Sequence, residues 1–245
     1  MTKLSDYTPA RVGLGITGES IPTAALLDFR LAQARARDAV HFSLNAESLA
    51  AELAQCGWPA LVLHSAAANR DEYLRRPDKG RRLSETSAVA VAGHKGSRAI
   101  AIIVADGLSA LAVHRHAVPL LKEMAPDDGH SFWIVRQGRV AVGDHIGELL
   151  QAELAIVMIG ERPGLSTPDS LGIYITWAPR VGRSDAERNC ISNIHGHGLS
   201  YEQAAHRSAF LVNAARARKL TGVGLKEESG PLKGTDSARL QEVGK

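Results

Sequence analysis

The strongest constraint on the fold is a series of short apolar runs that alternate with stretches of helical character. The runs are rich in Ile, Val, Leu and Ala, and they cover residues 99–105, 131–135, 154–159 and 171–177. Runs of this length and composition predict strands. Strands separated by helices favour βαβ units, because a parallel crossover needs a connection of about a helix in length. The sequence therefore predicts an α/β fold with a Rossmann-like, mostly parallel sheet covered by helices on both faces.

Upstream of these strands the sequence has helical periodicity. Pro22 begins a run through Val40 whose apolar residues recur at the spacing of one helix face. Proline suits a first helical turn, where its missing N–H costs no hydrogen bond. Asn45 is a favourable N-cap for a second helix that ends near Gln55. Residues 60–63 are apolar too, but periodicity does not distinguish a short strand from buried helix in so short a run.

Capping residues predict two further helices nearer the C-terminus. Asp144 is expected to cap a helix that runs through Ala152, and Ser200 with Gln203 forms a capping box for a last helix ending near Leu220. Beyond this helix the chain loses its periodicity. The predicted organisation has three parts: an N-terminal helical portion (1–95), a Rossmann-like α/β domain (96–225) and a mobile C-terminal tail (226–245).

Composition places the chain among ordinary globular proteins. Of its 245 residues 44% are hydrophobic, which excludes wholesale disorder, and a net charge of +3 is too small to predict a nucleic-acid partner. No apolar run approaches the roughly 20 residues that cross a bilayer. Two cysteines are too few for a disulfide framework. We therefore expect an intracellular protein with no nucleic-acid and no membrane partner.

Polar segments that follow the predicted strands are the candidate ligand-binding loops. In an open α/β sheet, ligands bind beyond the carboxyl ends of the strands, near the point where the strand order reverses. Three segments are expected at such positions: residues 106–109 (DGLS), 160–164 (GERPG) and the stretch around 190–196 (CISNIHG). The sequence predicts that these loops form a ligand site.

No segment supplies a catalytic or metal-binding set. The glycines of residues 13–18 have the spacing of a dinucleotide loop, but they follow no convincing strand. His114 with His116, and His195 with His197, are two residues apart, a spacing that a helix points to different faces. We therefore predict no catalytic residue and no metal ligand in this chain. This pattern favours a binding subunit.

A basic cluster around the turn at residues 77–80 leaves two interpretations open. Its members are Arg75, Arg76, Lys79, Arg81 and Arg82. The cluster either contacts an acidic partner or a ligand phosphate, or it forms a solvated helix junction with Asp71, Glu72 and Glu85. The second interpretation is favoured, because most charge clusters of this kind are exposed and weakly paired.

Two residues of the candidate loops also have alternatives. Glu161 follows a predicted strand, so its carboxylate either accepts hydrogen bonds from amide groups of a ligand or pairs with Arg162 to order the loop. Cys190 has no activating neighbour in the sequence. A free cysteine of this kind is usually a small hydrophobe, which argues against a nucleophile.

An ordered series of motifs resembles the small (light, beta) subunit of ethanolamine ammonia-lyase. The motifs are YLRRPDKGRRL (73–83), DGLSA (106–110), QGRV (137–140), DHIGE (144–148), GERPGL (160–165) and CISNIH (190–195). The similarity covers about residues 10 to 225. One such run could arise by chance, whereas the whole series in this order is specific for the family.

The resemblance implies a radical enzyme made of two kinds of subunit. That family uses adenosylcobalamin to convert ethanolamine to acetaldehyde and ammonia. Its large subunit, the partner in a hetero-oligomer, binds ethanolamine and carries the radical chemistry, while the small subunit completes the cobalamin site. Matched by motif, the family's cobalamin contacts fall on Val140, Glu161 and Cys190. Their implied roles are hydrogen bonding to the amide and nucleotide periphery for Glu161, and packing for the other two.

The resemblance also bears on localisation. Some family members carry an N-terminal extension that addresses the enzyme to a bacterial microcompartment. This sequence starts almost directly at the shared pattern, so two expectations stay open: a bacterial microcompartment by family resemblance, or the cytoplasm because the targeting extension is not apparent. The alternative function is a free-standing α/β protein that binds a nucleotide or a corrinoid without catalysis. A basic nucleic-acid-binding protein is a third and weaker hypothesis.

Overall fold

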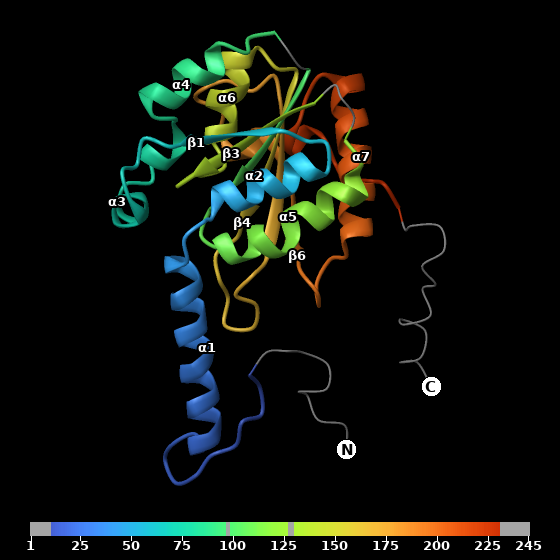
Figure 1. The fold of residues 1–245 in the computed structure, drawn as a ribbon. Helices are drawn as coiled ribbons and strands as arrows, with labels where there is room; N and C mark the ends of the chain where they lie inside the picture. Colours follow the sequence, from blue (N-terminus) through green and yellow to red (C-terminus); the bar gives the residue numbers. More distant parts are fainter. Residues whose placement is uncertain (1–10, 97–98, 127–129, 231–245) are drawn as a thin grey trace.

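The structure is a computed structural model that describes residues 11–96, 99–126 and 130–230. It shows a layered α/β body from which one long helix, α1 (Thr23–His41), projects (Figure 1). Residues 231–245, most of the predicted mobile tail, lie outside the described residues.

Six strands form one sheet through the middle of the body. They are β1 (Ala60–His64), β2 (Ile100–Ala105), β3 (His130–Arg136), β4 (Leu154–Gly160), β5 (Leu171–Trp177) and β6 (Arg188–Ile194). Their order across the sheet is β1-β3-β2-β4-β5-β6. The first four in this order are parallel, whereas β5 is antiparallel to β4 and β6 is antiparallel to β5. The predicted α/β fold is confirmed, and the antiparallel strands at one edge make the sheet mixed.

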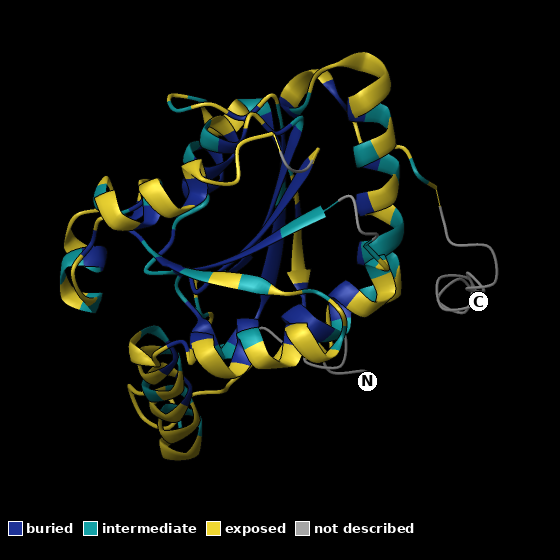
Figure 2. Cartoon of the chain, turned by 45° about the horizontal axis from the view of Figure 1, so that its top comes forward, coloured by how far each residue is buried: buried dark blue, intermediate teal, exposed yellow. Residues whose placement is uncertain are grey.

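Helices cover both faces of this sheet. Helices α2 (Ala46–Gln55), α5 (Ala110–Met124) and α7 (Tyr201–Arg218) pack on one face, and α4 (Glu85–Ala92) with α6 (Val142–Leu150) on the other. Because side chains of a strand alternate between the two faces, neighbouring residues of β2 enter different cores. Ile102 joins the core under α5, and Ile103 joins the core under α6. Figure 2 shows the central strands of the sheet as a buried layer between exposed helix surfaces, while the edge strands β1 and β6 are partly exposed.

The predicted helix starts are confirmed where a side chain caps the helix. Asn45 Oδ1 accepts a hydrogen bond from the Ser48 N–H at 3.1 Å and so caps α2. Ser200 and Gln203 make the predicted reciprocal capping box at the start of α7. Pro22, predicted in the first helical turn, is instead the N-cap of α1, just before the helix begins at Thr23, and makes no side-chain capping hydrogen bond.

The N-terminal segment contributes to the sheet, which differs from the predicted helical portion of residues 1–95. β1 pairs in parallel with β3 along its full length, from Ala60 opposite Phe132 to His64 opposite Arg136. Trp58, just before β1, stacks on the Phe132 ring at 5.9 Å between centroids. The apolar run at 60–63 is therefore a strand. Local periodicity could not show this, because the strand's partner lies about 70 residues further along the chain.

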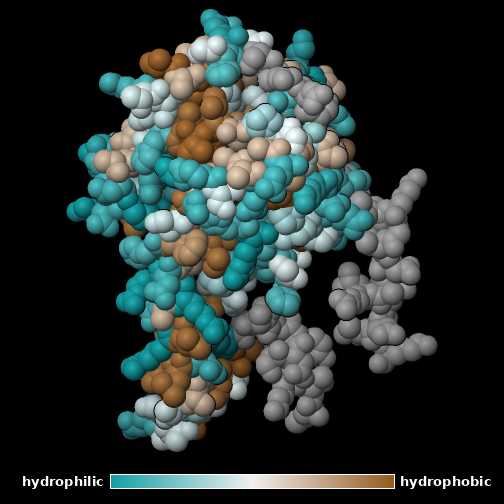
Figure 3. Space-filling model, viewed as in Figure 1, coloured by the Kyte–Doolittle hydropathy of each residue, from teal (hydrophilic) through white to brown (hydrophobic). Residues whose placement is uncertain are grey.

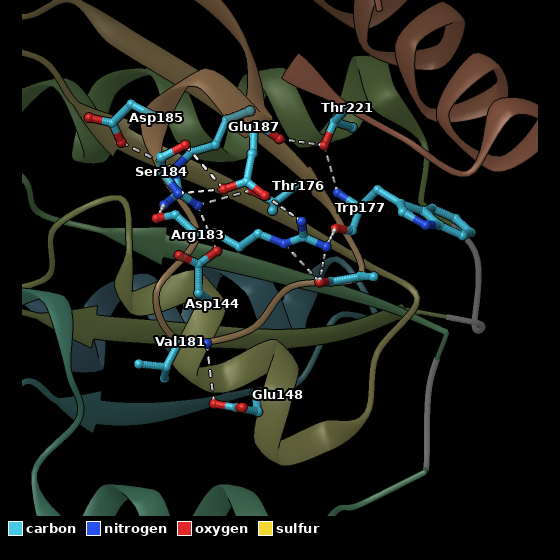
Figure 4. Close-up of polar contacts among 12 residues, drawn as sticks. Asp144, Glu148, Thr176, Trp177, Val181, Arg183, Ser184, Asp185, Glu187 and Thr221 are labelled. Carbon is cyan, nitrogen blue, oxygen red and sulfur yellow. Dashed lines mark hydrogen bonds and ion pairs between the residues drawn. The ribbon is translucent and has the colours of Figure 1, made fainter. Parts of the chain in front are cut away.

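Asp144 has a different role from the predicted helix cap. Helix α6 begins two residues earlier, so Asp144 lies inside its first turn. Asp144 Oδ1 accepts a hydrogen bond from Arg188 Nη1 at 2.6 Å, and both side chains are only 2% exposed. Arg188 also donates to Thr176 Oγ1 and to the Arg183 carbonyl. Figure 4 shows Asp144, Thr176 and Arg183 close together in this region. This buried ion pair joins β6 to α6, and the hydrogen bond to the Arg183 carbonyl adds the β5–β6 connection to the same cluster.

Helix α1 leaves much apolar surface uncovered. Of its residues only Ala32 and Ala39 are buried. Leu27 is 59% exposed and Leu31 is 51% exposed. The space-filling view shows hydrophobic surface along this projecting helix (Figure 3). An uncovered apolar face of this kind commonly marks a protein contact.

The buried ion pair predicts a large effect of an Arg188→Ala substitution. Removing one partner leaves the Asp144 carboxylate buried without its counter-charge, which costs about 3–5 kcal/mol of unfolding free energy. The double substitution Asp144→Ala with Arg188→Ala removes both charges and should be less destabilised than Arg188→Ala alone. Urea unfolding of Arg188→Ala, Asp144→Ala and the double variant measures this. Strictly additive single-variant effects would contradict the coupling.

Candidate functional site

The strand order places a topological switch point between β2 and β4. From β2 the chain passes to β3 on one side, and it then returns to β4 on the other side of β2. Ligand sites of open α/β sheets lie at the carboxyl edge beside such a point. The loops that leave β2, β3 and β4 at this edge are residues 106–109, 137–141 and 161–170. Two of them contain segments that the sequence predicted as binding loops.

The loops after β2 and β4 touch backbone to backbone. The Leu108 N–H donates to the Gly160 carbonyl oxygen at 3.0 Å. A Cβ added at Gly107 would lie 2.2 Å from that same oxygen, and one at Gly160 would lie 2.0 Å from the Ser109 carbonyl oxygen. Gly107 also has a positive φ of 56°. Glycine is therefore required at both positions for the two loops to meet this closely.

The meeting loops enclose an open cleft of about 500 Å³. It is lined by residues from β5, from the three loops, from α3 (Arg70–Arg75), and from the short 3₁₀ helices η2 (Lys79–Arg81) and η3 (Asp185–Glu187). The lining includes Val140 and Glu161, two of the three residues that the sequence predicted as cofactor contacts. The structure therefore brings these two residues into one cleft, although they come from different loops.

Asp106, at the end of β2, holds the wall of the cleft that contains Val140. Its two carboxylate oxygens accept hydrogen bonds from the Gln137 and Gly138 N–H groups, each at 2.9 Å. Arg70 Nη1 lies 3.6 Å from the same carboxylate. Burial raises the pKa of Asp106 to about 6, and the hydrogen bonds and Arg70 oppose this rise. The carboxylate thereby fixes the start of the β3–α6 loop.

Tyr73 on α3 connects a remote segment to the same wall. Its hydroxyl donates to the Gly138 carbonyl oxygen at 3.2 Å, and the residue is 1% exposed. Its ring lies between the guanidinium groups of Arg70 and Arg139, at 4.7 and 4.6 Å from the ring centroid. Such cation–π contacts strengthen when they are shielded from water. Sequence analysis missed Tyr73 as a site residue, because nothing local indicates that α3 packs against a loop about 65 residues away.

Glu161 is held by the β5–β6 side of the cleft. Its Oε2 accepts hydrogen bonds from the Ser170 hydroxyl and from the Asn193 N–H, the latter at 3.2 Å. Within the described part of the chain Oε1 has no hydrogen-bond partner. No ion pair joins Glu161 to Arg162 there, so that alternative is not what orders the loop. Glu161 is thus a half-buried carboxylate with one oxygen left to accept a hydrogen bond.

Cys190 lies on a strand, which corrects the predicted loop at 190–196. It is part of β6 and faces Tyr174 of β5 in the strand register. Tyr174 lines the cleft, so Cys190 is next to the cleft and is not part of its lining. Burial of the sulfur raises the pKa of the Cys190 thiol, and the nearby Glu161 carboxylate raises it further. The thiol is therefore protonated at neutral pH and a poor nucleophile.

Some members of the basic cluster at residues 75–82 fit the interpretation as a solvated helix junction, and another fits the interpretation as a ligand contact. Arg76 pairs with Asp78 at 2.8 Å, and Lys79 pairs with Glu72, as expected of a solvated junction. Arg81, by contrast, lines the cleft. The cluster is therefore partly a helix junction and partly a wall of the site.

The described ranges contain neither a metal site nor a membrane-spanning helix. No group of three His, Cys, Asp or Glu side chains there is arranged to hold a metal ion. No helix among these residues is long and apolar enough to cross a membrane. The fold and the open cleft define the chain as an α/β protein with a candidate ligand site at the carboxyl edge of its sheet.

Comparison with known proteins identifies the family. The family model described as ethanolamine ammonia-lyase light chain (EutC) matches residues 1–226. An ethanolamine ammonia-lyase small subunit from Xanthomonas campestris pv. campestris is 54% identical over 247 residues, covering 96% of this chain and 91% of the relative. The small subunit from Pseudomonas syringae pv. tomato is 52% identical over 248 residues, covering 96% and 86%. The chain belongs to the ethanolamine ammonia-lyase light-chain family and is part of a lyase.

The buried Asp106 predicts a pH dependence of stability. In the unfolded chain an aspartate titrates near about 3.9, whereas in the folded chain the pKa of Asp106 is about 6. Between these values the folded chain holds a proton that the unfolded chain has released. The unfolding free energy therefore falls as the pH rises through this window, by at most about 1.4 kcal/mol per pH unit. An Asp106→Asn variant lacks this contribution, and equal pH slopes for both chains in urea unfolding would contradict it.

Proposed function

We propose that this chain is the small subunit of an adenosylcobalamin-dependent ethanolamine ammonia-lyase and completes the cobalamin site on the large subunit. The observation that carries the proposal is the cleft at the switch point of the sheet, which Val140 and Glu161 line and Cys190 borders. When bound, cobalamin supplies a radical by homolysis of its cobalt–carbon bond. The residues of this chain bind and orient the cofactor.

The donor and acceptor set of the cleft fits the edge of a corrinoid. The corrin periphery carries neutral amide groups, whose N–H donors need oxygen acceptors. Glu161 Oε1 is such an acceptor, and the hydrogen bonds at Oε2 hold it in place. Val140 offers an apolar contact, and the protonated Cys190 thiol adds a small polarizable one. These residues hold the cofactor edge and exclude water from it.

The size of the cleft supports a site shared between two subunits. A cleft of about 500 Å³ suits a drug-sized molecule, and a cobalamin is considerably larger. The chain therefore offers a surface for one edge of the cofactor, and a second subunit is needed to cover the rest. The exposed apolar face of α1, with Leu27 and Leu31, is a surface on which such a partner would dock.

The proposal predicts that activity needs both subunits. The chain, alone and co-expressed with a candidate large subunit from the same genome, is assayed for adenosylcobalamin-dependent release of acetaldehyde from ethanolamine. We expect activity only in the mixture, with the two chains co-eluting. No activity and no co-elution with a competent large subunit would overturn the proposal. Cobalamin or nucleotide binding by the isolated chain would then favour the free-standing α/β binder.

Glu161→Ala is predicted to weaken cobalamin retention by the complex without unfolding this subunit. Loss of a hydrogen bond to a charged group costs about 1.5–3 kcal/mol, which corresponds to about 10- to 100-fold in affinity. Absorbance titration with cobalamin measures the affinity, and circular dichroism verifies the fold. The matched control is Glu123→Ala, which changes an exposed glutamate on α5 that does not line the cleft. Unchanged cofactor affinity in the Glu161 variant would remove this residue from the site.

A further inference from the structure

Three arginines line the cleft, and each comes from a different segment of the chain. Arg81 ends η2, Arg139 lies in the loop after β3, and Arg162 lies in the loop after β4. The sequence separates them by more than 20 residues in each case. Their convergence is therefore a product of the tertiary structure, and sequence patterning does not reveal it.

These arginines differ from their neighbours in lacking acidic partners. Arg70, Arg76, Arg183 and Arg188 each pair with an aspartate or a glutamate. In the part of the chain that the structure describes, the side chains of Arg81 and Arg162 make no ion pair and no hydrogen bond, although the Arg81 backbone N–H donates to the Asp78 carbonyl oxygen at 3.2 Å. Arg139 stacks on Tyr73 and donates Nη2 to the Tyr73 carbonyl oxygen at 3.2 Å, while its buried Nε has no partner there.

The two carboxylates of the cleft leave these cations uncompensated. Glu161 is engaged through Oε2 by Ser170 and Asn193. Asp185 has a side chain that is 95% exposed, and its carboxylate lies 3.3 Å from Arg188. Neither forms an ion pair with Arg81, Arg139 or Arg162 among the described residues. The cleft therefore offers guanidinium donors that no carboxylate of the described residues pairs with.

We infer that Arg81, Arg139 and Arg162 form an anion subsite that takes a phosphodiester. The inference rests on the proposed function, because the phosphodiester of the nucleotide arm is the anionic group on the periphery of cobalamin. Guanidinium groups bind phosphate oxygens through two parallel hydrogen bonds, a geometry that ammonium groups lack. The cleft then separates two tasks: Glu161 accepts hydrogen bonds from amides, and the arginines hold the phosphate.

The test uses the complex of both subunits and two corrinoids. Cyanocobalamin carries the phosphodiester, whereas dicyanocobinamide lacks the phosphate with the rest of the nucleotide arm. The variant is Arg81→Ala with Arg162→Ala, because neither side chain makes an ion pair or a hydrogen bond within the described ranges. Arg139 is left intact, since it packs on Tyr73. The matched control is Arg218→Ala, an exposed arginine in the last turn of α7 that does not line the cleft.

We expect the double variant to bind cyanocobalamin at least about 10-fold more weakly and to bind dicyanocobinamide as the wild type does, because charge-assisted hydrogen bonds are the strong ones. Lysine at both positions should restore part of the affinity. The ³¹P resonance of bound cobalamin gives a second readout that does not require cobinamide to bind. Its shift on binding should be reduced in the alanine variant and unchanged in the control.

Three results would overturn the inference. Equal weakening of both corrinoids would show that the arginines do not recognise the phosphate. Weaker association of the subunits in the absence of any corrinoid would assign the arginines to acidic side chains of the large subunit. An unchanged ³¹P shift with unchanged cyanocobalamin affinity would leave the arginines without a ligand role. A wild-type complex that binds no cobalamin would instead reject the proposed function.

Discussion

The site depends on one buried carboxylate, that of Asp106 at the end of β2. It accepts hydrogen bonds from the N–H groups of Gln137 and Gly138, and so it joins the carboxyl ends of the neighbouring strands β2 and β3. Arg70 faces this carboxylate, and it also donates to the carbonyl oxygens of Gly107 and Val40. Loops from distant parts of the chain are thereby fixed around one charge. A buried carboxylate is costly unless it is paired in this way, so these contacts form together.

The rest of the cleft follows from this arrangement. Once the loop after β3 is held, Val140 and Arg139 face the loop after β4, which meets the β2 loop through Gly107 and Gly160. On the far side of the cleft the buried ion pair of Arg188 with Asp144 holds β6 in place, and β6 is the strand that borders the cleft. The result is a preformed but open surface, which is what the proposed shared site requires.

Much of the fold could be predicted, and the exceptions have physical causes. Strands β2 to β5 are apolar along their length, so composition reveals them. β6 carries Asn189, Cys190, Ser192 and Asn193 at the sheet edge, and a polar edge strand resembles a loop in sequence. Asp144 is a residue type that commonly caps helices, yet its carboxylate instead accepts a hydrogen bond from the buried Arg188, 44 residues away.

For the site, the sequence determined the loops after β2 and β4, the helices capped by Asn45 and Ser200, and the motif series that carries the family resemblance, because these depend on residues close together in the chain. It also identified Val140, Glu161 and Cys190 as candidates. Tertiary structure alone decided that Val140 and Glu161 share a cleft, that Cys190 faces Tyr174, and which arginines remain unpaired. These outcomes are set by contacts between segments tens of residues apart, and local propensity carries no information on which distant side chain will neutralise a given charge.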